Sequence, residues 1–176
     1  MLIYLQMLET PEEKSKFEQI YLEYRNLMFY VSKGILHNQQ DAEDAVQEAF
    51  LKIIKIIDQI EDPKCPKTKN LTVMIVERTA IDLWRRQKKL QRVSMEEDDL
   101  ELGSVKEIES VEHASTLALA MATLPAKYRE VLLLRYDNGF SEAEIANILS
   151  MSLANVHKTI QRAKKKLEQT LEEQEG

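Results

Sequence analysis

The stretch that most constrains the fold runs from Ser141 to Leu167 and reads SEAEIANILSMSLANVHKTIQRAKKKL. Ser141 and Glu144 have the S-x-x-E spacing of a capping box, in which each side chain bonds the backbone N–H of the other, so we expect a helix to begin here. Leu149–Met151 is the predicted turn, and Ser152 can cap the N-terminus of a second helix. Two helices joined by so short a turn predict a helix-turn-helix motif.

The second helix has two chemically different faces. Its apolar residues are spaced by 4, 3 and 4 positions and make one stripe at the helical period, formed by Val156, Ile160, Ala163 and Leu167. The opposite face and its flanks are polar and basic, with Asn155, His157, Lys158, Gln161, Arg162 and Lys165. Cations contact DNA phosphates, and Asn, Gln and Arg read base edges in the major groove, so this face predicts DNA binding. A solvated basic face on an ordinary helical hairpin is the alternative, which the capping box, the short turn and the one-sided charge disfavour.

The composition predicts an all-α protein. The 176 residues are 44% hydrophobic with four glycines and four prolines, and alternating β-branched runs are absent. The single Cys65 excludes an internal disulfide and a cysteine metal site, and the three histidines lack ligand spacing, so we expect no metal and no cofactor. A nucleophile–base pair and a phosphate-binding loop are also missing from the sequence, which disfavours an enzyme.

The sequence contains no apolar run of membrane-spanning length. Residues 1–7 are apolar, but they are few and lack a basic leader, so a signal peptide is not expected. These features predict a cytoplasmic protein without membrane insertion.

The net charge of −6 is unevenly distributed along the chain. Residues 93–113 contain eight acidic residues and one lysine, so this stretch carries −7 and the rest of the chain carries +1. The residues from Arg85 to Arg92 and from Lys158 to Lys166 are strongly basic. Because the local field governs contact with nucleic acid, the acidic total is compatible with DNA binding.

The apolar pattern predicts two helical domains. In residues 1–92 we expect an amphipathic helix over 12–36, a second starting near Asp41 with an apolar stripe that continues to Ile60, and a third over about 71–90 after a polar loop at 61–70. Residues 93–110 have the composition of a linker. The second domain is predicted at 111–176, with a helix over 111–123, Pro125 in the first turn of the next helix, Gly139 ending it, and a frayed tail at 168–176.

Three segments together resemble a bacterial RNA polymerase sigma factor of the sigma-70 family, namely DAEDAVQEAFLKI (41–53), AIDLWRR (80–86) and TLPAKYREVLLLRYDNGFSEAEIANIL (123–149). The size and the two-domain layout resemble the extracytoplasmic-function (ECF) group. The resemblance implies a region 2-like three-helix domain and a region 4-like four-helix domain with the helix-turn-helix. It also implies a factor that binds core RNA polymerase, directs it to minus-10 and minus-35 promoter elements and promotes transcription initiation.

The resemblance also implies the partners and the roles of particular residues. The partners are promoter DNA and core polymerase, through the clamp helices of its largest subunit and its flap, and an anti-sigma factor is a further partner that the family allows. Polymerase docking falls on Asp44, Gln47, Glu48 and Phe50, where an acidic patch beside exposed aromatic surface suits a basic helical hairpin. Binding at the minus-10 element falls on Lys64, Lys67, Lys69, Asn70, Arg85, Arg86, Lys88 and Lys89. The helix from Ser152 to Lys166 corresponds to the minus-35 reader, so Ser152 joins the six residues of its polar face.

The sequence departs from the family pattern at four positions. Leu71 stands where the family has Trp, Arg78 where it has Asn, Ser150 where the turn has Gly, and Asn155 where a Thr is usual. The main alternative function is a stand-alone helix-turn-helix regulator that does not bind polymerase, against which the acidic docking segment argues. A helical-repeat scaffold is disfavoured because the sequence has no repeat period.

Overall fold

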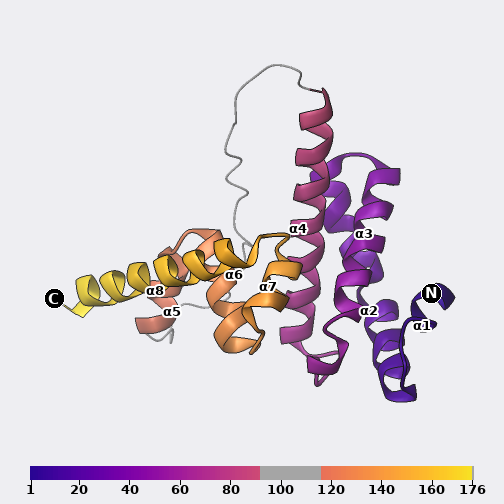
Figure 1. The fold of residues 1–176 in the computed structure, drawn as a ribbon, viewed down its shortest axis with the longest axis horizontal. Helices are drawn as coiled ribbons and strands as arrows, with labels where there is room; N and C mark the ends of the chain where they lie inside the picture. The colour runs from indigo at the N-terminus through magenta and orange to yellow at the C-terminus, as the bar shows by residue number, and fades with distance from the viewer. Residues whose placement is uncertain (92–115, 176) are drawn as a thin grey trace. The chain divides into compact units, whose positions relative to one another are not determined.

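The computed structural model describes residues 1–91 and 116–175, which divide into two compact helical units (Figure 1). The N-terminal unit contains α1 to α4, and α5 to α8 belong to the C-terminal half of the chain. Within the described ranges every regular element is a helix, which confirms the prediction of an all-α fold. The predicted linker at 93–110 and the predicted start of the second domain at 111 lie outside the described residues.

The first long helix, α2 (Pro11–Leu36), begins at a complete capping box. The Thr10 hydroxyl accepts from the Glu13 backbone N–H at 3.1 Å, while the Glu13 carboxylate accepts from the Thr10 N–H at 2.9 Å. The helix ends at His37, whose φ of 55° is left-handed and stops the helical hydrogen-bond pattern. The predicted helix over 12–36 is therefore confirmed to within one residue.

The next helix, α3 (Gln39–Ile54), begins two residues before the predicted Asp41. The side chain of Asn38 accepts from the Asp41 N–H at 3.1 Å, so the cap lies at Asn38 and the acidic residues fall inside the first turns. The apolar stripe predicted to continue to Ile60 extends past the helix, because α3 ends at Ile54. A 3-10 turn, η1 (Ile57–Gln59), then keeps the remaining isoleucines buried, namely Ile56, Ile57 and Ile60.

The third helix, α4 (Pro66–Gln91), begins five residues before the predicted Leu71. Two prolines, at 63 and 66, led to the prediction of a loop over 61–70. Pro66 instead occupies the first helical position, where its missing N–H costs nothing because that group has no partner inside a helix. The predicted loop is therefore wrong from residue 66 onward, and only residues 61–65 precede the helix.

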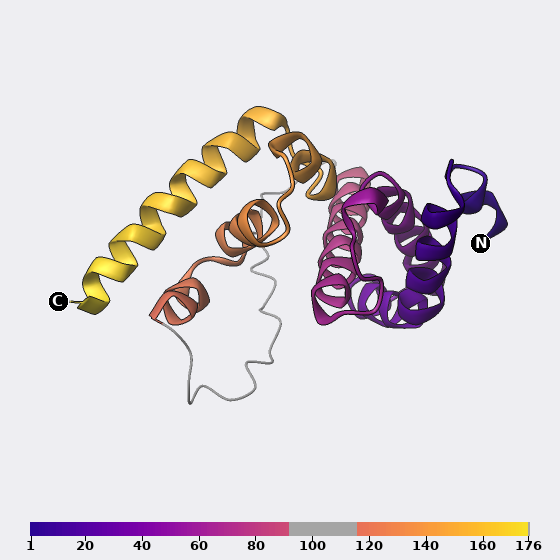
Figure 2. The same ribbon diagram turned by 90° about the horizontal axis from the view of Figure 1, so that it is seen from below.

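The helices α2, α3 and α4 lie side by side around one hydrophobic core, which Figure 2 shows nearly end-on. Each helix contributes side chains that are completely or almost completely removed from solvent: Phe17, Ile20, Met28, Phe50, Ile53, Ile75 and Val76. Burying an apolar side chain of this size contributes roughly 1.5–3 kcal/mol. Among the described residues no helix is long and apolar enough to cross a membrane.

The C-terminal unit contains α5 (Thr116–Thr123), α6 (Ala126–Leu132) and the π-helical turn η3 (Leu133–Asp137), and Pro125 caps α6 one residue before the predicted first turn. Gly139 follows with φ 75°, a left-handed conformation that confirms the predicted end of this helix. The predicted capping box also forms, with Ser141 N–H donating to Glu144 at 2.7 Å, and it starts α7 (Glu142–Ile148).

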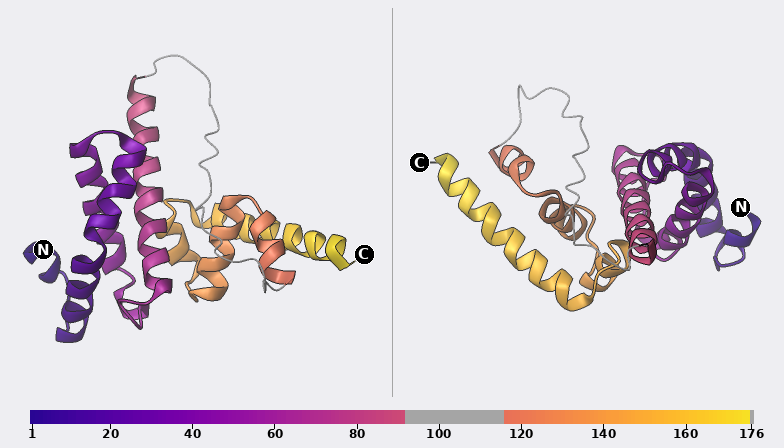
Figure 3. Two further views of the ribbon diagram at one scale, coloured as in Figure 1. Left: turned by 180° about the vertical axis from the view of Figure 1, so that it is seen from behind. Right: turned by 90° about the horizontal axis from the view of Figure 1, so that it is seen from above.

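The last helix, α8 (Leu153–Glu175), packs against α5 and α6 (Figure 3). The Ser152 hydroxyl accepts from the Asn155 N–H at 3.2 Å, which confirms the predicted cap. The frayed tail predicted at 168–176 is wrong, because residues 168–175 continue α8. This segment consists of Glu, Gln, Thr and Leu171, mostly good helix formers, and Leu171 is half-buried.

Candidate polymerase and DNA interfaces

The predicted reading face lies on the solvent side of α8. Val156, Ile160 and Ala163 are buried, and Leu167 is half-buried, so the apolar stripe faces the unit's core as predicted. All seven residues assigned to the minus-35 element are exposed, namely Ser152, Asn155, His157, Lys158, Gln161, Arg162 and Lys165. Their exposure meets a requirement of the DNA-binding hypothesis, since groove contacts need side chains that project away from the core.

Two residues of this face have partners inside the helix-turn-helix. His157 Nδ1 lies 3.1 Å from a carboxylate oxygen of Glu142 on α7, so the ring is held toward the first helix of the motif. The Asn155 carbonyl accepts from the Thr159 hydroxyl at 2.7 Å, and the Asn155 side chain lies 3.5 Å from the same hydroxyl. These contacts orient His157 and Asn155 before any DNA binds.

An additional basic residue of α8, Lys164, stacks over an aromatic ring. Its ammonium lies 5.1 Å from the ring centroid of Tyr136 in η3, which is a cation–π geometry. Tyr136 itself is 58% exposed, so the pair lies on the surface of the unit. Sequence periodicity could not identify this pair, because 28 positions separate the two residues and only the packing of α8 on the preceding helices brings them together.

The basic residues predicted for the minus-10 element fall at the two ends of α4. Lys64 lies in the turn before the helix, Lys67, Lys69 and Asn70 lie in its first turns, and all four are exposed. The Asp62 carboxylate accepts from the Lys64 N–H at 2.9 Å. The helix dipole and the lysine side chains both make the electrostatic potential at this N-terminus positive. Such a potential suits a phosphate or a base edge.

The segment before α4 is held by Thr68. Its buried hydroxyl donates to the Asp62 carbonyl at 2.6 Å and lies 3.5 Å from Cys65 Sγ. The hydrogen bond with Thr68 lowers the pKa of the Cys65 thiol. Leu71, which replaces the family's Trp, is buried in the core, so its side chain is not presented to DNA.

The basic arm at the C-terminal end of α4 contains exposed Arg85, Arg86 and Lys89. Lys88 lies over the ring of Trp84, with its ammonium 4.0 Å from the centroid, so it is half-buried. Arg86 Nη2 donates to the Glu48 carboxylate of α3 at 3.0 Å. A residue predicted to bind DNA is therefore paired with one predicted to bind polymerase.

The predicted docking residues on α3 differ in exposure. Asp44 and Gln47 are exposed, and Glu48 is partly exposed and lies 3.9 Å from Lys52 as well as being bonded to Arg86. Phe50 is only 1% exposed, so the expectation that it forms exposed aromatic surface is wrong. The chain itself covers Phe50, and three of the four predicted docking residues remain accessible.

The ring of Phe50 is part of an aromatic cluster. The centroid of its ring lies 4.9 Å from that of Tyr21, 5.7 Å from Phe17 and 5.9 Å from Tyr4 of α1 (Leu2–Leu5). Tyr4 and Tyr21 were not assigned to any site from the sequence. The signal for Tyr4 was the apolar segment at residues 1–7, whose position on α3 follows only from the tertiary fold.

Both halves of the chain match known proteins. Residues 20–90 match the family model described as Sigma-70 region 2, and residues 115–167 match Sigma-70, region 4. The RNA polymerase sigma factor SigV of Bacillus subtilis is 31% identical over 142 residues, 81% of this chain and 80% of SigV. The RNA polymerase sigma-E factor of Streptomyces antibioticus is 30% identical over 163 residues, 91% of this chain and 87% of that one. A solved structure of CnrH in complex with the cytosolic domain of CnrY shares 21% identity with a TM-score of 0.37, covering 97% of this chain and 96% of CnrH.

Proposed function

The chain belongs to the sigma-70 family of RNA polymerase sigma factors, in the ECF group, and we propose from this premise how its two units divide the work of transcription initiation. The protein binds core RNA polymerase and directs it to promoters. The N-terminal unit docks on the clamp helices of the largest subunit and contacts the minus-10 element. The C-terminal unit lies near the flap and contacts the minus-35 element.

The observation that carries the proposal is the two-faced α8. Its apolar stripe is buried, while Lys158, Arg162 and Lys165 project to solvent from the opposite side without an intervening acidic residue. In a helix-turn-helix the second helix enters the major groove, where arginine makes planar two-point contacts with guanine and lysine neutralises phosphates. Arg162 therefore reads bases, and Lys158 and Lys165 position the helix on the backbone.

In the N-terminal unit, α3 and α4 have separate roles. Exposed Asp44 and Gln47 face the polymerase, whose basic clamp helices complement the acidic surface of α3. Arg85 and Arg86 contact duplex phosphates, and the lysines at the start of α4 contact the melted strand of the minus-10 element.

The protein supplies binding energy and position, and the polymerase performs the phosphoryl chemistry. Its own residues have no catalytic step to perform, and its place of action is the cytoplasm, where polymerase and chromosome meet. An anti-sigma factor that masks these surfaces is a partner compatible with this function.

Run-off transcription with bacterial core polymerase tests the proposal. Core polymerase plus the purified protein is incubated with a library of promoters randomised at both elements, and the transcribed templates are sequenced. We expect transcription only when the protein is present, with enrichment of one minus-35 and one minus-10 sequence. A protein that selects a DNA site alone but neither binds core polymerase nor supports transcription is a stand-alone regulator, and the proposal is then wrong.

A charge-reversal variant provides the internal control. Lys158→Glu combined with Lys165→Glu alters two exposed residues of α8, so the fold and the docking surface on α3 are preserved. We expect this variant to co-purify with core polymerase as the wild type does, while transcription from minus-35-dependent promoters is lost. Loss of both functions together contradicts the division of roles between the two units.

A further inference from the structure

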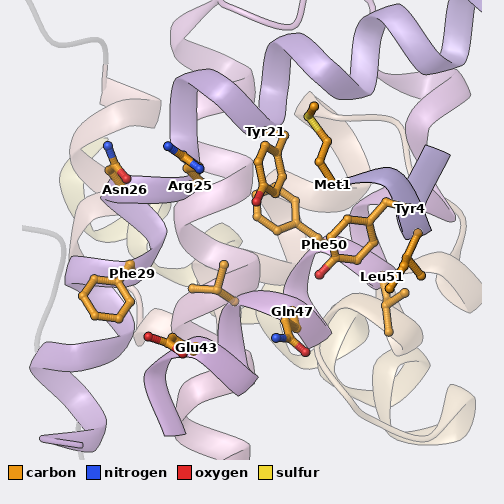
Figure 4. A pocket seen from close by; sticks show the side chains of 12 residues that line it. Met1, Tyr4, Tyr21, Arg25, Asn26, Phe29, Glu43, Gln47, Phe50 and Leu51 are labelled. Carbon is orange, nitrogen blue, oxygen red and sulfur yellow. The ribbon is translucent and has the colours of Figure 1, made fainter. Parts of the chain in front are cut away.

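A cavity of about 560 Å³ lies on the N-terminal unit where α1, α2 and α3 meet (Figure 4). The first wall comes from α1 and the residue before it, with Met1, Ile3 and Tyr4, and the opposite wall comes from α3, with Gln47 and Leu51. Rings of α2 and α3 line the space between these walls, namely Tyr21, Phe29 and Phe50. The cavity is therefore mostly apolar and has the volume needed for one or two large side chains of a partner.

The position of α1 is fixed by its contacts with the unit. The Tyr4 ring lies 5.5 Å from Phe17 and 5.9 Å from Phe50, distances typical of packed aromatic pairs. Leu8, which follows α1, is buried, and the capping box at Thr10 starts α2 immediately afterwards. The packing of Tyr4, within α1, and the burial of Leu8 just after it fix the position of this helix on the unit. The side chains that α1 directs outward therefore form a defined surface.

That outward surface is strongly apolar. Leu2 is 77% and Ile3 76% exposed, and Leu51 of α3, across the cavity, is 38% exposed. Solvent-exposed large apolar side chains that gather around an apolar cavity mark an interaction site, whereas scattered ones are ordinary. Three such residues line this one cavity, namely Met1 (44% exposed), Ile3 and Leu51, and Leu2 is the neighbour of Ile3 in α1. Their gathering favours a binding surface.

The charge around the cavity identifies the kind of partner. Glu43 lines the cavity and exposed Asp44 is its neighbour on the same helix, while the Glu48 carboxylate is already paired with Arg86 and Lys52. The basic side chain in the lining is Arg25 of α2, on the other side, and its guanidinium lies over the Tyr21 ring at 5.6 Å. The α3 side of the cavity is therefore acidic, which complements a basic partner that carries an apolar side chain at its centre.

Gln47 connects the cavity with the proposed docking surface. It is one of the exposed residues assigned to polymerase docking, and it also lines the cavity. We propose that core RNA polymerase inserts an apolar side chain of a basic segment into this cavity, and that Leu2 and Ile3 of α1 form the far half of the docking surface. This inference rests on the proposed function and extends it to a segment that precedes the residues matched to region 2.

The opposite role for α1 predicts an opposite result. If α1 covered the surface that polymerase needs, its removal would strengthen binding, because polymerase would no longer have to displace it. As a part of the interface, α1 must strengthen binding, and its removal must weaken it. The sign of the change in affinity for core polymerase therefore decides between the two roles.

The test measures core-polymerase affinity of the full-length protein with Leu2→Ser and Ile3→Ser combined. Both side chains are more than three-quarters exposed, so folding is unaffected, which the fluorescence of Trp84 verifies. We expect binding about tenfold weaker, as is typical when apolar anchors of an interface are truncated. The matched control is Leu90→Ser, also highly exposed but at the far end of α4, which should bind core polymerase like the wild type. Unchanged or tighter binding by the Leu2–Ile3 variant overturns the inference.

A second variant fills the cavity instead of trimming its edge. Val46→Phe places a larger ring from α3 into the space, and we expect roughly fivefold to tenfold weaker binding to core polymerase with the unit still folded. Normal binding by this variant contradicts insertion of a polymerase side chain.

Asp44→Lys in the same assay distinguishes failure of this inference from failure of the proposed function. If Asp44→Lys loses binding while the α1 and Val46 variants do not, the proposed function stands and the inference fails. If wild-type protein itself does not bind core polymerase, the proposed function fails.

Discussion

The proposed DNA-reading face of α8 and the proposed docking face of α3 are both exposed sides of amphipathic helices, yet they are built differently. On α8 the buried apolar stripe occupies one side of the helix and, within the described residues, nothing from the same unit covers the other side. All seven side chains predicted to bind DNA are therefore exposed. On α3 a neighbouring element intervenes at two places: Tyr4 packs against Phe50, and Arg86 binds Glu48. Lys158, Arg162 and Lys165 of α8 should therefore act independently. Glu48 and Phe50 of α3 are coupled to other helices, and on α8 the same holds for His157, which contacts Glu142 of α7.

The largest expected effect is a loss of stability on replacing Phe50, a predicted docking residue that lies in the core. Phe50→Ala should lower the free energy of unfolding by about 3–5 kcal/mol, because it leaves a cavity between Tyr4, Phe17 and Tyr21. Urea unfolding of the full chain, followed by fluorescence of its single tryptophan, Trp84 in the same unit, measures this change. Leu51→Ala, at the partly exposed neighbour, should cost under about 1.5 kcal/mol. A Phe50 variant of normal stability would show that the ring is not part of the core.

The next effect concerns the exposed part of α3. Asp44→Lys should weaken binding to core polymerase by roughly 2–3 kcal/mol, because it removes an attraction to the basic clamp helices and adds a repulsion. Stability should be unchanged, since Asp44 is exposed. The control is Glu23→Lys, the same change of charge at an exposed position of α2. Equal affinities for wild type and Asp44→Lys would remove α3 from the docking surface.

Neighbouring side chains on the exposed face of α8 should have separable roles. Arg162→Ala should change the preferred minus-35 bases, since a two-point contact to guanine gives roughly 1–3 kcal/mol of discrimination. Lys165→Ala should lower affinity about equally for all sequences, because phosphates carry no sequence information. Selection from randomised minus-35 sequences with holoenzyme measures both. If Arg162→Ala selects the wild-type sequence with a uniform loss, Asn155, His157 or Gln161 must read the bases.

Coupling between helices is tested at the basic arm of α4. Replacing Arg85 and Arg86 by Ala should weaken promoter binding and lower the slope of log K against log salt by about 0.9 for each phosphate that is no longer neutralised. An unchanged slope would mean that the arm is only a solvated helix end.

A double-mutant cycle measures the Arg86–Glu48 ion pair between α4 and α3. Glu48→Gln is made in the wild type and in the Arg86→Ala variant, and the free energies of unfolding are compared. We expect a coupling energy of roughly 0.2–1 kcal/mol, as for an exposed ion pair.

An effect as small as that of the Arg86–Glu48 ion pair is expected in the turn of the helix-turn-helix. Ser150 has φ 52°, a left-handed conformation that glycine adopts without steric cost, so Ser150→Gly should stabilise the helix-turn-helix by about 0.5–1 kcal/mol. Gly139→Ala is the matched control of opposite sign, because Gly139 has φ 75° and a Cβ there would meet no atom within 4 Å, which leaves only the backbone cost. Thermal unfolding followed by circular dichroism measures both, and destabilisation by Ser150→Gly would contradict a strained turn.

The sequence by itself determined the features that depend on residues a few positions apart. The capping box at Ser141, the cap at Ser152 and the apolar stripe of α8 follow from spacings of three or four residues, and each is present. The region 2 and region 4 resemblance was likewise visible in the sequence and is confirmed by the family matches. Local hydrogen bonds and helical periodicity suffice for these features, because one helix contains all the atoms involved.

Only the tertiary structure decided which side chains that a single helix leaves uncovered are then covered by other helices. Phe50 belongs to an apolar surface of α3 that the pattern of α3 alone could have left open to polymerase, and it is Tyr4, 46 positions earlier, that packs on it. Glu48 and Arg86 meet across 38 positions for the same reason. Their contact depends on how α3 and α4 pack on a shared core, and that packing is set by the combined shape of side chains from several helices, which no periodicity within one helix encodes.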